Sequence, residues 1–178
     1  MEFVRPSVEY KDSFTEAVRE FQAEVPCINE TTRRYQELSI PELRQDFDSF
    51  VERERSHSRG ENMPAGYIPQ TEFWLVDVEE YIGHVGIRHE LNEHLLHIGG
   101  HIGYSIRPSK RGQGYGNKIL ELALPEAKKL GLDKVLLTCD VTNVASRKII
   151  EKNGGALENQ VPNPETGVDK LRFWITIS

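Results

Sequence analysis

A glycine-rich segment holds the residues whose types and spacing are most suggestive of chemistry. It runs from Arg107 to Leu120 and reads RPSKRGQGYGNKIL, between an apolar run that predicts a strand and an amphipathic run that predicts a helix. Its glycines, Gly112, Gly114 and Gly116, have no Cβ, so several backbone N–H groups can come close to a ligand. The first turn of the following helix adds unpaired amides at the positive end of the helix dipole. The loop therefore predicts a site for a di- or polyphosphate.

The spacing of the glycines limits which phosphate-containing ligand the loop could bind. A dinucleotide-binding fingerprint, GxGxxG read from Gly112, would need a glycine where Asn117 stands, and no nucleoside-triphosphate loop of the form GxxxxGK[ST] occurs in the chain. The motif present is RxxGxG, from Arg111 to Gly116. A glycine-rich turn that binds nothing is the alternative for so short a motif on its own.

A second sequence segment supports the ligand site predicted from the first. Asn143 to Gly155 reads NVASRKIIEKNGG and follows a short apolar run, residues 135–139, that suits a buried strand. In this order, with 27 residues from Gly116 to Asn143, the two segments resemble the acetyl-CoA pyrophosphate loop and the second conserved block of the GCN5-related N-acetyltransferases (GNAT family). The resemblance covers residues 70–178 well and the N-terminal third in outline. It implies the acyl-CoA N-acyltransferase (GNAT) fold and acetyl-CoA as co-substrate.

The resemblance also implies which residues contact the coenzyme. Main-chain groups at the end of the loop strand would pair with the pantetheine arm, and the loop amides would hold the pyrophosphate. Asn143 and Ser146 would lie beside the coenzyme, although Asn143 also fits a plain helix cap. The expected contacts are Ile106, Arg107, Arg111, Gly112, Gln113, Gly114, Tyr115, Gly116, Asn143 and Ser146.

Acetyl transfer from a thioester to an amine needs a donor for the oxyanion and stabilisation or protonation of the leaving thiolate. Many members of the family place a Tyr seven residues after the conserved Asn, and here that position is Ile150. Tyr104 is the expected substitute, ahead of Tyr115, although a lone Tyr in a strand is more often a packed aromatic. A backbone N–H near Ser105 or Ile106 is the expected oxyanion donor.

The amine must also lose a proton. His101 is one expected catalytic residue, because it lies on the strand that would carry the acetyl group and imidazole titrates near neutral pH. Glu72, Glu90 and Asp140 are alternatives, as is a chain of water to bulk solvent. Five of the six histidines fall between His84 and His101, but their spacing matches no usual ligand set for zinc, so no metal is expected.

Length and composition favour one soluble domain. The 178 residues suffice for a single core, and the net charge of −6 argues against a general nucleic-acid binder. No apolar run approaches the ~20 residues of a membrane span, and the N-terminus lacks the features of a secretory signal. Cys27 and Cys139 form no CxxC pair. We therefore expect a cytoplasmic protein that partners neither nucleic acid nor membrane.

Hydrophobic periodicity predicts the order strand, two helices, three strands, helix, strand, helix, two strands. The early helices are Tyr10 to Val25 and one that begins with a capping box, Ser39 to Glu42. Hairpins imply antiparallel pairing, and the unit from Gly100 to Cys139 implies a parallel pair. We expect an α/β (α+β) fold with a mixed, mostly antiparallel central sheet and helices on both faces. Pro125 should kink or break its helix.

Residues 1–178 are expected to form a single N-acetyltransferase domain, with 1–69 as a helical substrate-side segment and 70–178 as the coenzyme-binding core. The expected function is acetyl-CoA-dependent transfer of an acetyl group to a primary amine of a small molecule or peptide. A catalytically degenerate coenzyme A-binding sensor or regulatory domain is the alternative, which Ile150 favours. A non-enzymatic interaction module is a third reading. The sequence leaves the acceptor and a homodimer open.

Overall fold

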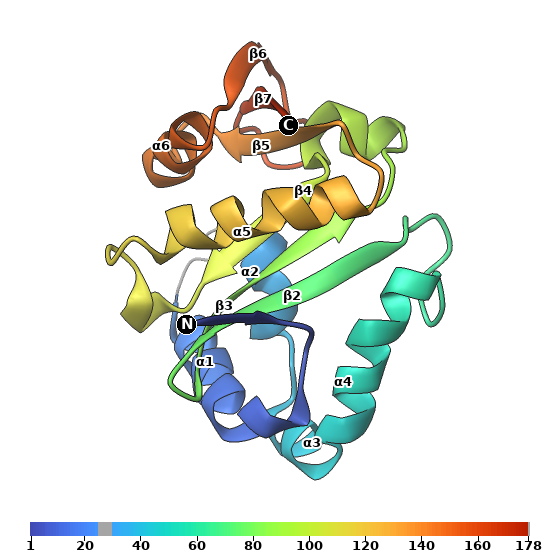
Figure 1. Cartoon of the computed structure of the whole chain (residues 1–178), viewed down its shortest axis with the longest axis vertical. Helices are drawn as coiled ribbons and strands as arrows, with labels where there is room; N and C mark the ends of the chain where they lie inside the picture. Colours follow the sequence, from blue (N-terminus) through green and yellow to red (C-terminus); the bar gives the residue numbers. More distant parts are fainter. Residues whose placement is uncertain (25–29, 178) are drawn as a thin grey trace.

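Two antiparallel sheets form the centre of the molecule in the computed structural model, which describes residues 1–24 and 30–177 (Figure 1). The first sheet has the order β1-β2-β3-β4 and the second the order β5-β7-β6. The strands of the first are β1 (Glu2–Val4), β2 (Gln70–Asp77), β3 (Glu80–Arg88) and β4 (Ile102–Ile106). Those of the second are β5 (Lys134–Asp140), β6 (Ala156–Val161) and β7 (Lys170–Thr176).

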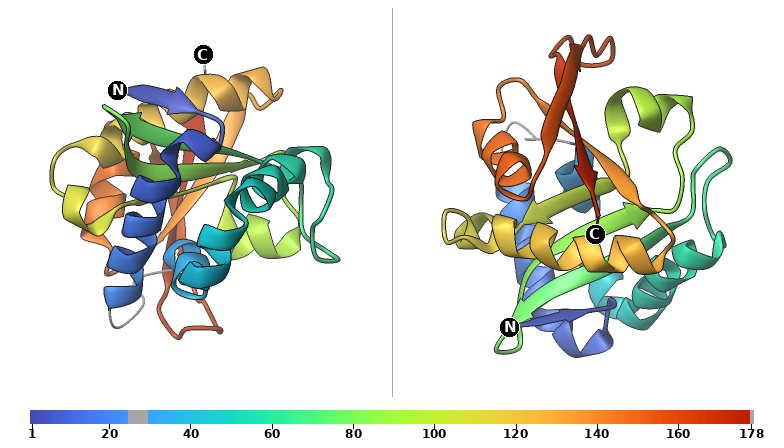
Figure 2. Two further views of the ribbon diagram at one scale, coloured as in Figure 1. Left: turned by 90° about the horizontal axis from the view of Figure 1, so that it is seen from below. Right: turned by 45° about the horizontal axis from the view of Figure 1, so that its top comes forward.

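Helices cover both faces of the first sheet. The N-terminal helices lie on one face, and α5 crosses the other with α6 beside it (Figures 1 and 2). The N-terminal set is α1 (Lys11–Ala23), α2 (Glu30–Gln36), α3 (Ile40–Gln45) and α4 (Phe47–Ser56), and the other face carries α5 (Tyr115–Lys129) and α6 (Val144–Lys152). Single turns complete the chain at η1 (Val8–Tyr10), η2 (His57–Arg59), η3 (Leu95–Gly99) and η4 (Pro108–Lys110).

Alternation along β2 divides its side chains between two cores. Leu75 packs with α5 and the second sheet, whereas Trp74 and Val76 belong to an aromatic core under the N-terminal helices. In this second core Phe14 of α1 stacks on Trp74 with ring centroids 4.7 Å apart. Glu72 has the same parity as Trp74, so it lies on the face that the N-terminal helices cover.

The two sheets separate between β4 and β5. The amide of His101 donates to the carbonyl of Leu136 at 2.7 Å, and this link joins the start of β4 to β5. Beyond it the strands belong to different sheets, so the predicted mixed sheet is split in two and the predicted parallel ladder is wrong. β4 is the edge of its sheet and leaves one side of its backbone facing the gap.

Strand geometry tells which β4 residues face that gap. In an antiparallel pair, alternate residues direct both N–H and C=O to the partner. The amide of Arg107 donates to the carbonyl of Ile82, and the carbonyl of His101 accepts from Arg88, so the odd-numbered residues bond to β3. Tyr104 and Ile106 therefore direct their main-chain groups towards the gap.

The predicted fold class is confirmed, with differences in local detail. Ser39 caps α3 by accepting from the amide of Glu42 at 3.5 Å, which is one half of the expected capping box. The predicted helix is divided at Asp46, whose carboxylate caps α4 through the amide of Ser49 at 3.2 Å. The sequence did not predict α2 or the π-helical turn η3. The expected break at Pro125 is wrong, because α5 continues through it with one face buried in the core. The predicted end of the first helix at Val25 falls outside the described residues. No described helix is both long and apolar enough to cross a membrane.

Candidate active site

The glycine loop between β4 and α5 uses its glycines for two different reasons. Gly112 and Gly114 have φ of 74° and 87°, and an added Cβ at either would meet nothing within 4 Å, so these positions need the left-handed backbone. At Gly116 a Cβ would lie 2.5 Å from Cδ1 of Ile149, so this glycine lets α5 pack against α6. Gly114 caps α5 without any side-chain hydrogen bond among the described residues. The first-turn amides of α5 are thus available to an anion.

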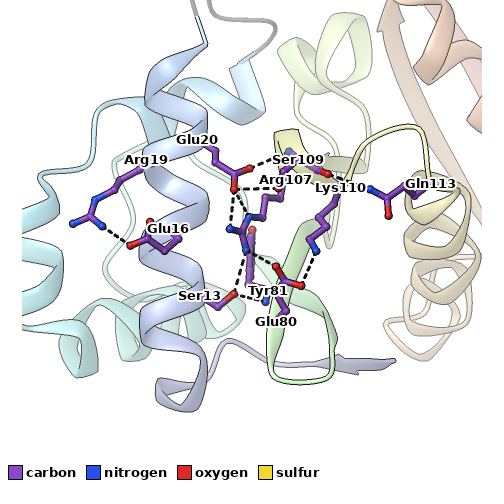
Figure 3. Close-up of polar contacts among 10 residues, drawn as sticks. All are labelled: Ser13, Glu16, Arg19, Glu20, Glu80, Tyr81, Arg107, Ser109, Lys110 and Gln113. Atoms are coloured by element: carbon purple, nitrogen blue, oxygen red, sulfur yellow. Dashed lines mark hydrogen bonds and ion pairs between the residues drawn. The ribbon is translucent and has the colours of Figure 1, made fainter.

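The carboxylates of Glu20 and Glu80, which we call the brace, bind the segment that leads into this loop (Figure 3). Glu20 of α1 accepts hydrogen bonds from the amide and the hydroxyl of Ser109, both at 3.0 Å, and from Nε of Arg107 at 2.8 Å. Glu80 accepts from Nζ of Lys110 at 2.6 Å and from Arg107 at 3.2 Å. Burial opposes ionisation of Glu20, but the hydrogen bonds from Arg107 and Ser109 hold its pKa below the ordinary value. The first helix therefore positions the loop.

Several predicted contacts use their side chains to bind other parts of the chain. Arg107 spends its amide on Ile82, its carbonyl on the amide of Lys110 and its guanidinium on Glu20 and Glu80, so it anchors the start of the loop. Its main-chain contact with pantetheine stays a prediction. Arg111 donates from Nε to the carbonyl of Ile106 at 3.0 Å and pairs with Glu24.

Two residues inside the loop behave in the same way. Gln113 donates from Nε2 to the carbonyl of Ser109 at 3.1 Å, and the hydroxyl of Tyr115 donates to Asp77 at 3.2 Å. These bonds fix the two side chains within the protein.

A cavity of about 300 Å³ lies between β4, the glycine loop and α6. It brings together residues of both sequence motifs, which are separated by a strand and a helix along the chain. The predicted contacts that line it are Ile106, Arg111, Gly112, Gly116, Asn143 and Ser146, together with Tyr104.

Tyr104 is held by α6 at this cavity. Its hydroxyl lies 3.1 Å from Oγ of Ser146, and burial raises the pKa of Tyr104 to about 12 while the bond to Ser146 opposes that rise. Asn143 caps α6 by accepting from the amide of Ser146 at 3.0 Å, so the cap interpretation is confirmed, and it also lines the cavity.

A larger cavity of about 730 Å³ opens on the side of the N-terminal helices. It shares Tyr104, Asn143 and Ser146 with the smaller one, so the two cavities meet at these residues. Its walls come from α2, the segment before β2, strands β2 to β5 and η3. Glu72 and His84, each 1% exposed, are the most deeply buried titratable groups among the described residues of its wall.

The expected bases occupy different surroundings. His101 lines neither cavity: its Nδ1 accepts from the amide of Leu136 at 2.9 Å, and burial, then Arg88, lower its pKa to about 4. The structure thus places His101 in the β4–β5 link, apart from the meeting point of the cavities. Glu90 is exposed outside both cavities, and Asp140 lines the larger one but pairs with Lys170 at 2.8 Å.

Glu72 is the alternative that the fold brings to the wall of the larger cavity beside the N-terminal helices. Burial raises its pKa to about 7, and the neighbouring Arg34 opposes that rise. Sequence reasoning considered His84 only as a metal ligand. In the β2–β3 hairpin His84 lies opposite the buried Trp74, and this pairing could have indicated that His84 is buried on the same face of the sheet. In residues 1–24 and 30–177, no three His, Cys, Asp or Glu side chains converge on a metal position.

Comparisons with known proteins agree with this geometry. The family model of the acetyltransferase (GNAT) domain matches residues 14–156. A search of curated protein sequences gives no significant match. Among solved structures, RimL, a ribosomal L7/L12 alpha-N-protein acetyltransferase in complex with coenzyme A, has a TM-score of 0.68 at 19% identity, over 98% of this chain and 93% of that one.

Two further structures are similar over nearly their full length. The microcin C7 self-immunity acetyltransferase MccE, in complex with acetyl-CoA and AMP, has a TM-score of 0.70 at 15% identity, over 98% of this chain and 91% of that one. A chimera of the spermidine N-acetyltransferase SpeG from Vibrio cholerae and hSSAT has a TM-score of 0.61 at 16% identity, over 99% and 96%. At these identities the likenesses show the fold, and the family model decides membership. The chain belongs to the GNAT family of acetyltransferases.

Proposed function

We propose that this protein transfers the acetyl group of acetyl-CoA to a primary amine. The observation that carries the proposal is the meeting of two cavities at Tyr104, Asn143 and Ser146. The smaller cavity reaches the glycine loop and suits the pyrophosphate and pantetheine of a coenzyme. The larger one lies on the other side of the meeting point and is left for the acceptor. The coenzyme A and acetyl-CoA bound to RimL and MccE support the choice of donor.

Each chemical requirement then has a residue. The loop amides bind the pyrophosphate, and the outward main-chain groups of Tyr104 and Ile106 pair with pantetheine and offer an N–H to the oxyanion. The amine nitrogen attacks the thioester carbonyl, and the carbon–sulfur bond breaks. The hydroxyl of Tyr104, which Ser146 orients, donates to the departing sulfur. With a pKa of about 12, Tyr104 keeps its proton throughout the neutral range.

The test is release of free thiol from acetyl-CoA, measured with DTNB across a panel of amines. The panel contains spermidine, a peptide with a free α-amino group and glycinamide, because the relatives act on a polyamine and on a protein N-terminus. Thiol release with one of these amines supports the proposal. Coenzyme A binding by calorimetry without turnover on any amine would favour the sensor alternative, and the absence of coenzyme binding would favour an interaction module.

A further inference from the structure

Two residues on the wall of the larger cavity each hold a buried polar atom without a hydrogen-bond partner among the described residues. They are Glu72, through Oε2, and His84, through Nε2, and each residue is 1% exposed. No group within the described residues makes a hydrogen bond with either atom. Buried polar atoms in folded proteins are nearly always bonded, so two exceptions on one cavity wall mark a position for a ligand.

The strand register places these two atoms on one surface. Glu72 lies opposite Gly86 and Trp74 opposite His84 in the β2–β3 pair, so Glu72 and His84 are diagonal neighbours on the same face of the sheet. A Cβ at Gly86 would lie 3.0 Å from Oε2 of Glu72, so this glycine leaves room for the carboxylate. Gly86 in turn lies opposite Gly103, and the two glycines form an open floor that leads to β4.

The other oxygen of Glu72 is already held. Oε1 accepts from the hydroxyl of Tyr35 at 3.5 Å and lies 3.7 Å from Nη2 of Arg34. Arg34 also pairs with Glu54, so one guanidinium is shared by two carboxylates. Among the described residues, the charged and titratable groups around Glu72 are Arg5, Arg34, Tyr35, Glu54, Tyr81, His84 and Arg88.

His84 presents a donor beside this carboxylate. Burial first, and then Arg34, lower its pKa well below the ordinary value, so the ring is neutral. Its Nδ1 lies 3.2 Å from the hydroxyl of Tyr81, which keeps its proton because burial raises the pKa of Tyr81. With the phenol as donor to Nδ1, the ring proton is on Nε2, the nitrogen that has no partner among the described residues.

We infer that Glu72 and His84 form the acceptor subsite, where Oε2 of Glu72 binds the substrate ammonium and takes its proton, and Nε2–H of His84 binds an oxygen next to the amine. This inference rests on the proposed acetyl transfer. The substrate class is a primary amine with a neighbouring carbonyl or hydroxyl, such as an α-amino amide or the free N-terminus of a peptide.

The proton balance of the step is simple. One N–H bond of the ammonium breaks and its proton passes to Glu72. The freed electron pair attacks the thioester carbon, and the sulfur leaves with the pair of the broken bond. The nitrogen then loses a second proton, so that one proton restores the thiol and one is released to solvent.

The first test is the pH dependence of kcat/KM for glycinamide in wild type, Glu72→Gln and the control Glu54→Gln, which alters the other carboxylate on Arg34. Because Glu72 must be ionised to act, wild-type kcat/KM should fall about tenfold per pH unit below about pH 7. Glu72→Gln should lose roughly 10² or more in kcat/KM. It should also lose the decrease of kcat/KM below pH 7, which is the acidic limb of the profile, while calorimetry shows unchanged affinity for acetyl-CoA. Glu54→Gln should keep the limb. A Glu72→Gln enzyme with the limb intact would overturn the inference.

The second test is specificity. Wild type should prefer glycinamide to n-propylamine at least tenfold, and His84→Phe should reduce that ratio to about two, as expected when one hydrogen bond to the substrate is lost. His84→Gln, which keeps a side-chain donor, should recover part of the preference. An unchanged ratio in His84→Phe would remove His84 from the subsite.

A third measurement separates this inference from the proposed function. If wild type releases no thiol with any amine, the proposed function fails. The subsite is then tested separately, by following the titration of Glu72 through the NMR signal of its carboxyl carbon. Added glycinamide should lower the Glu72 pKa in wild type, because a bound ammonium favours the carboxylate. An unmoved pKa at saturating glycinamide would overturn the subsite as well.

Discussion

Replacing Glu72 by Gln should stabilise the protein above neutral pH even though it removes activity. The pKa of Glu72 rises on folding from 4.5 to about 7, chiefly through burial, so the fold disfavours the carboxylate. Below pH 4.5 the carboxyl is protonated in both states and contributes no penalty. As the pH rises through about 7, the unfolded chain ionises first and stability is lost. At 1.36 kcal/mol per pKa unit, the shift corresponds to a loss of up to about 3 kcal/mol.

The uncharged Gln resembles the protonated carboxyl at every pH. Urea unfolding should therefore show equal stability of wild type and Glu72→Gln near pH 4.5, and an advantage for the variant of up to about 3 kcal/mol at pH 8. At roughly 2–4 °C per kcal/mol for a chain of this size, the melting temperature should rise by about 6–12 °C.

The matched control is Glu52→Gln, which removes an exposed carboxylate that pairs with Arg59 on the surface. It should change stability by less than about 0.5 kcal/mol at either pH. The raised pKa of Glu72 would be refuted if Glu72→Gln were less stable than wild type at pH 8. It would also be refuted if the gain in stability did not depend on pH.

Three further variants test the coenzyme side. Tyr104→Phe should reduce kcat in the thiol-release assay by about 10²-fold or more with unchanged calorimetric affinity for acetyl-CoA, and near-normal turnover would assign the thiolate to another group. Gly114→Asp should weaken coenzyme A binding at least about 100-fold, because it strains a left-handed backbone and sets a negative charge beside the pyrophosphate; calorimetry of a folded variant with normal affinity would contradict the loop. Glu20→Gln should raise the KM for acetyl-CoA several-fold by loosening the brace at Ser109, with little change in kcat, and an effect confined to the amine KM would count against a positioning role.

The backbone form of the glycine loop could be predicted from the sequence because its requirement is local. Positive φ at Gly112 and Gly114 is a property of the backbone at those positions, and glycine is the residue that meets it. The anchoring contacts of Arg107 could not be predicted in this way. Its pairing depends on Ile82 and on Glu20, which lies 87 residues earlier in the chain, and no local pattern carries that information.

The acid–base residues were harder for the same reason. His101 and Glu72 were both plausible by residue type, but their roles depend on where the sheets join and on which helix covers them. His101 falls at the link between β4 and β5 and accepts the amide hydrogen of Leu136 at Nδ1. Glu72 lies under α2, where Tyr35 and Arg34 occupy one of its oxygens and leave the other open.

In the proposed reaction, the N-terminal third would act on both substrates at once. Its helix α2 covers Glu72, whose pKa burial raises to about 7, while α1 holds the start of the glycine loop through Glu20. The aromatic core under these helices joins the two functions, because Phe14 of α1 contacts Tyr35 of α2 edge to face with centroids 5.6 Å apart. A change that loosens this core should raise the exposure of Glu72 and lower its pKa towards 4.5. The acidic limb of the pH profile would then move to lower pH, and the KM for acetyl-CoA would rise at the same time. If the two sites were independent, one of these parameters would change without the other.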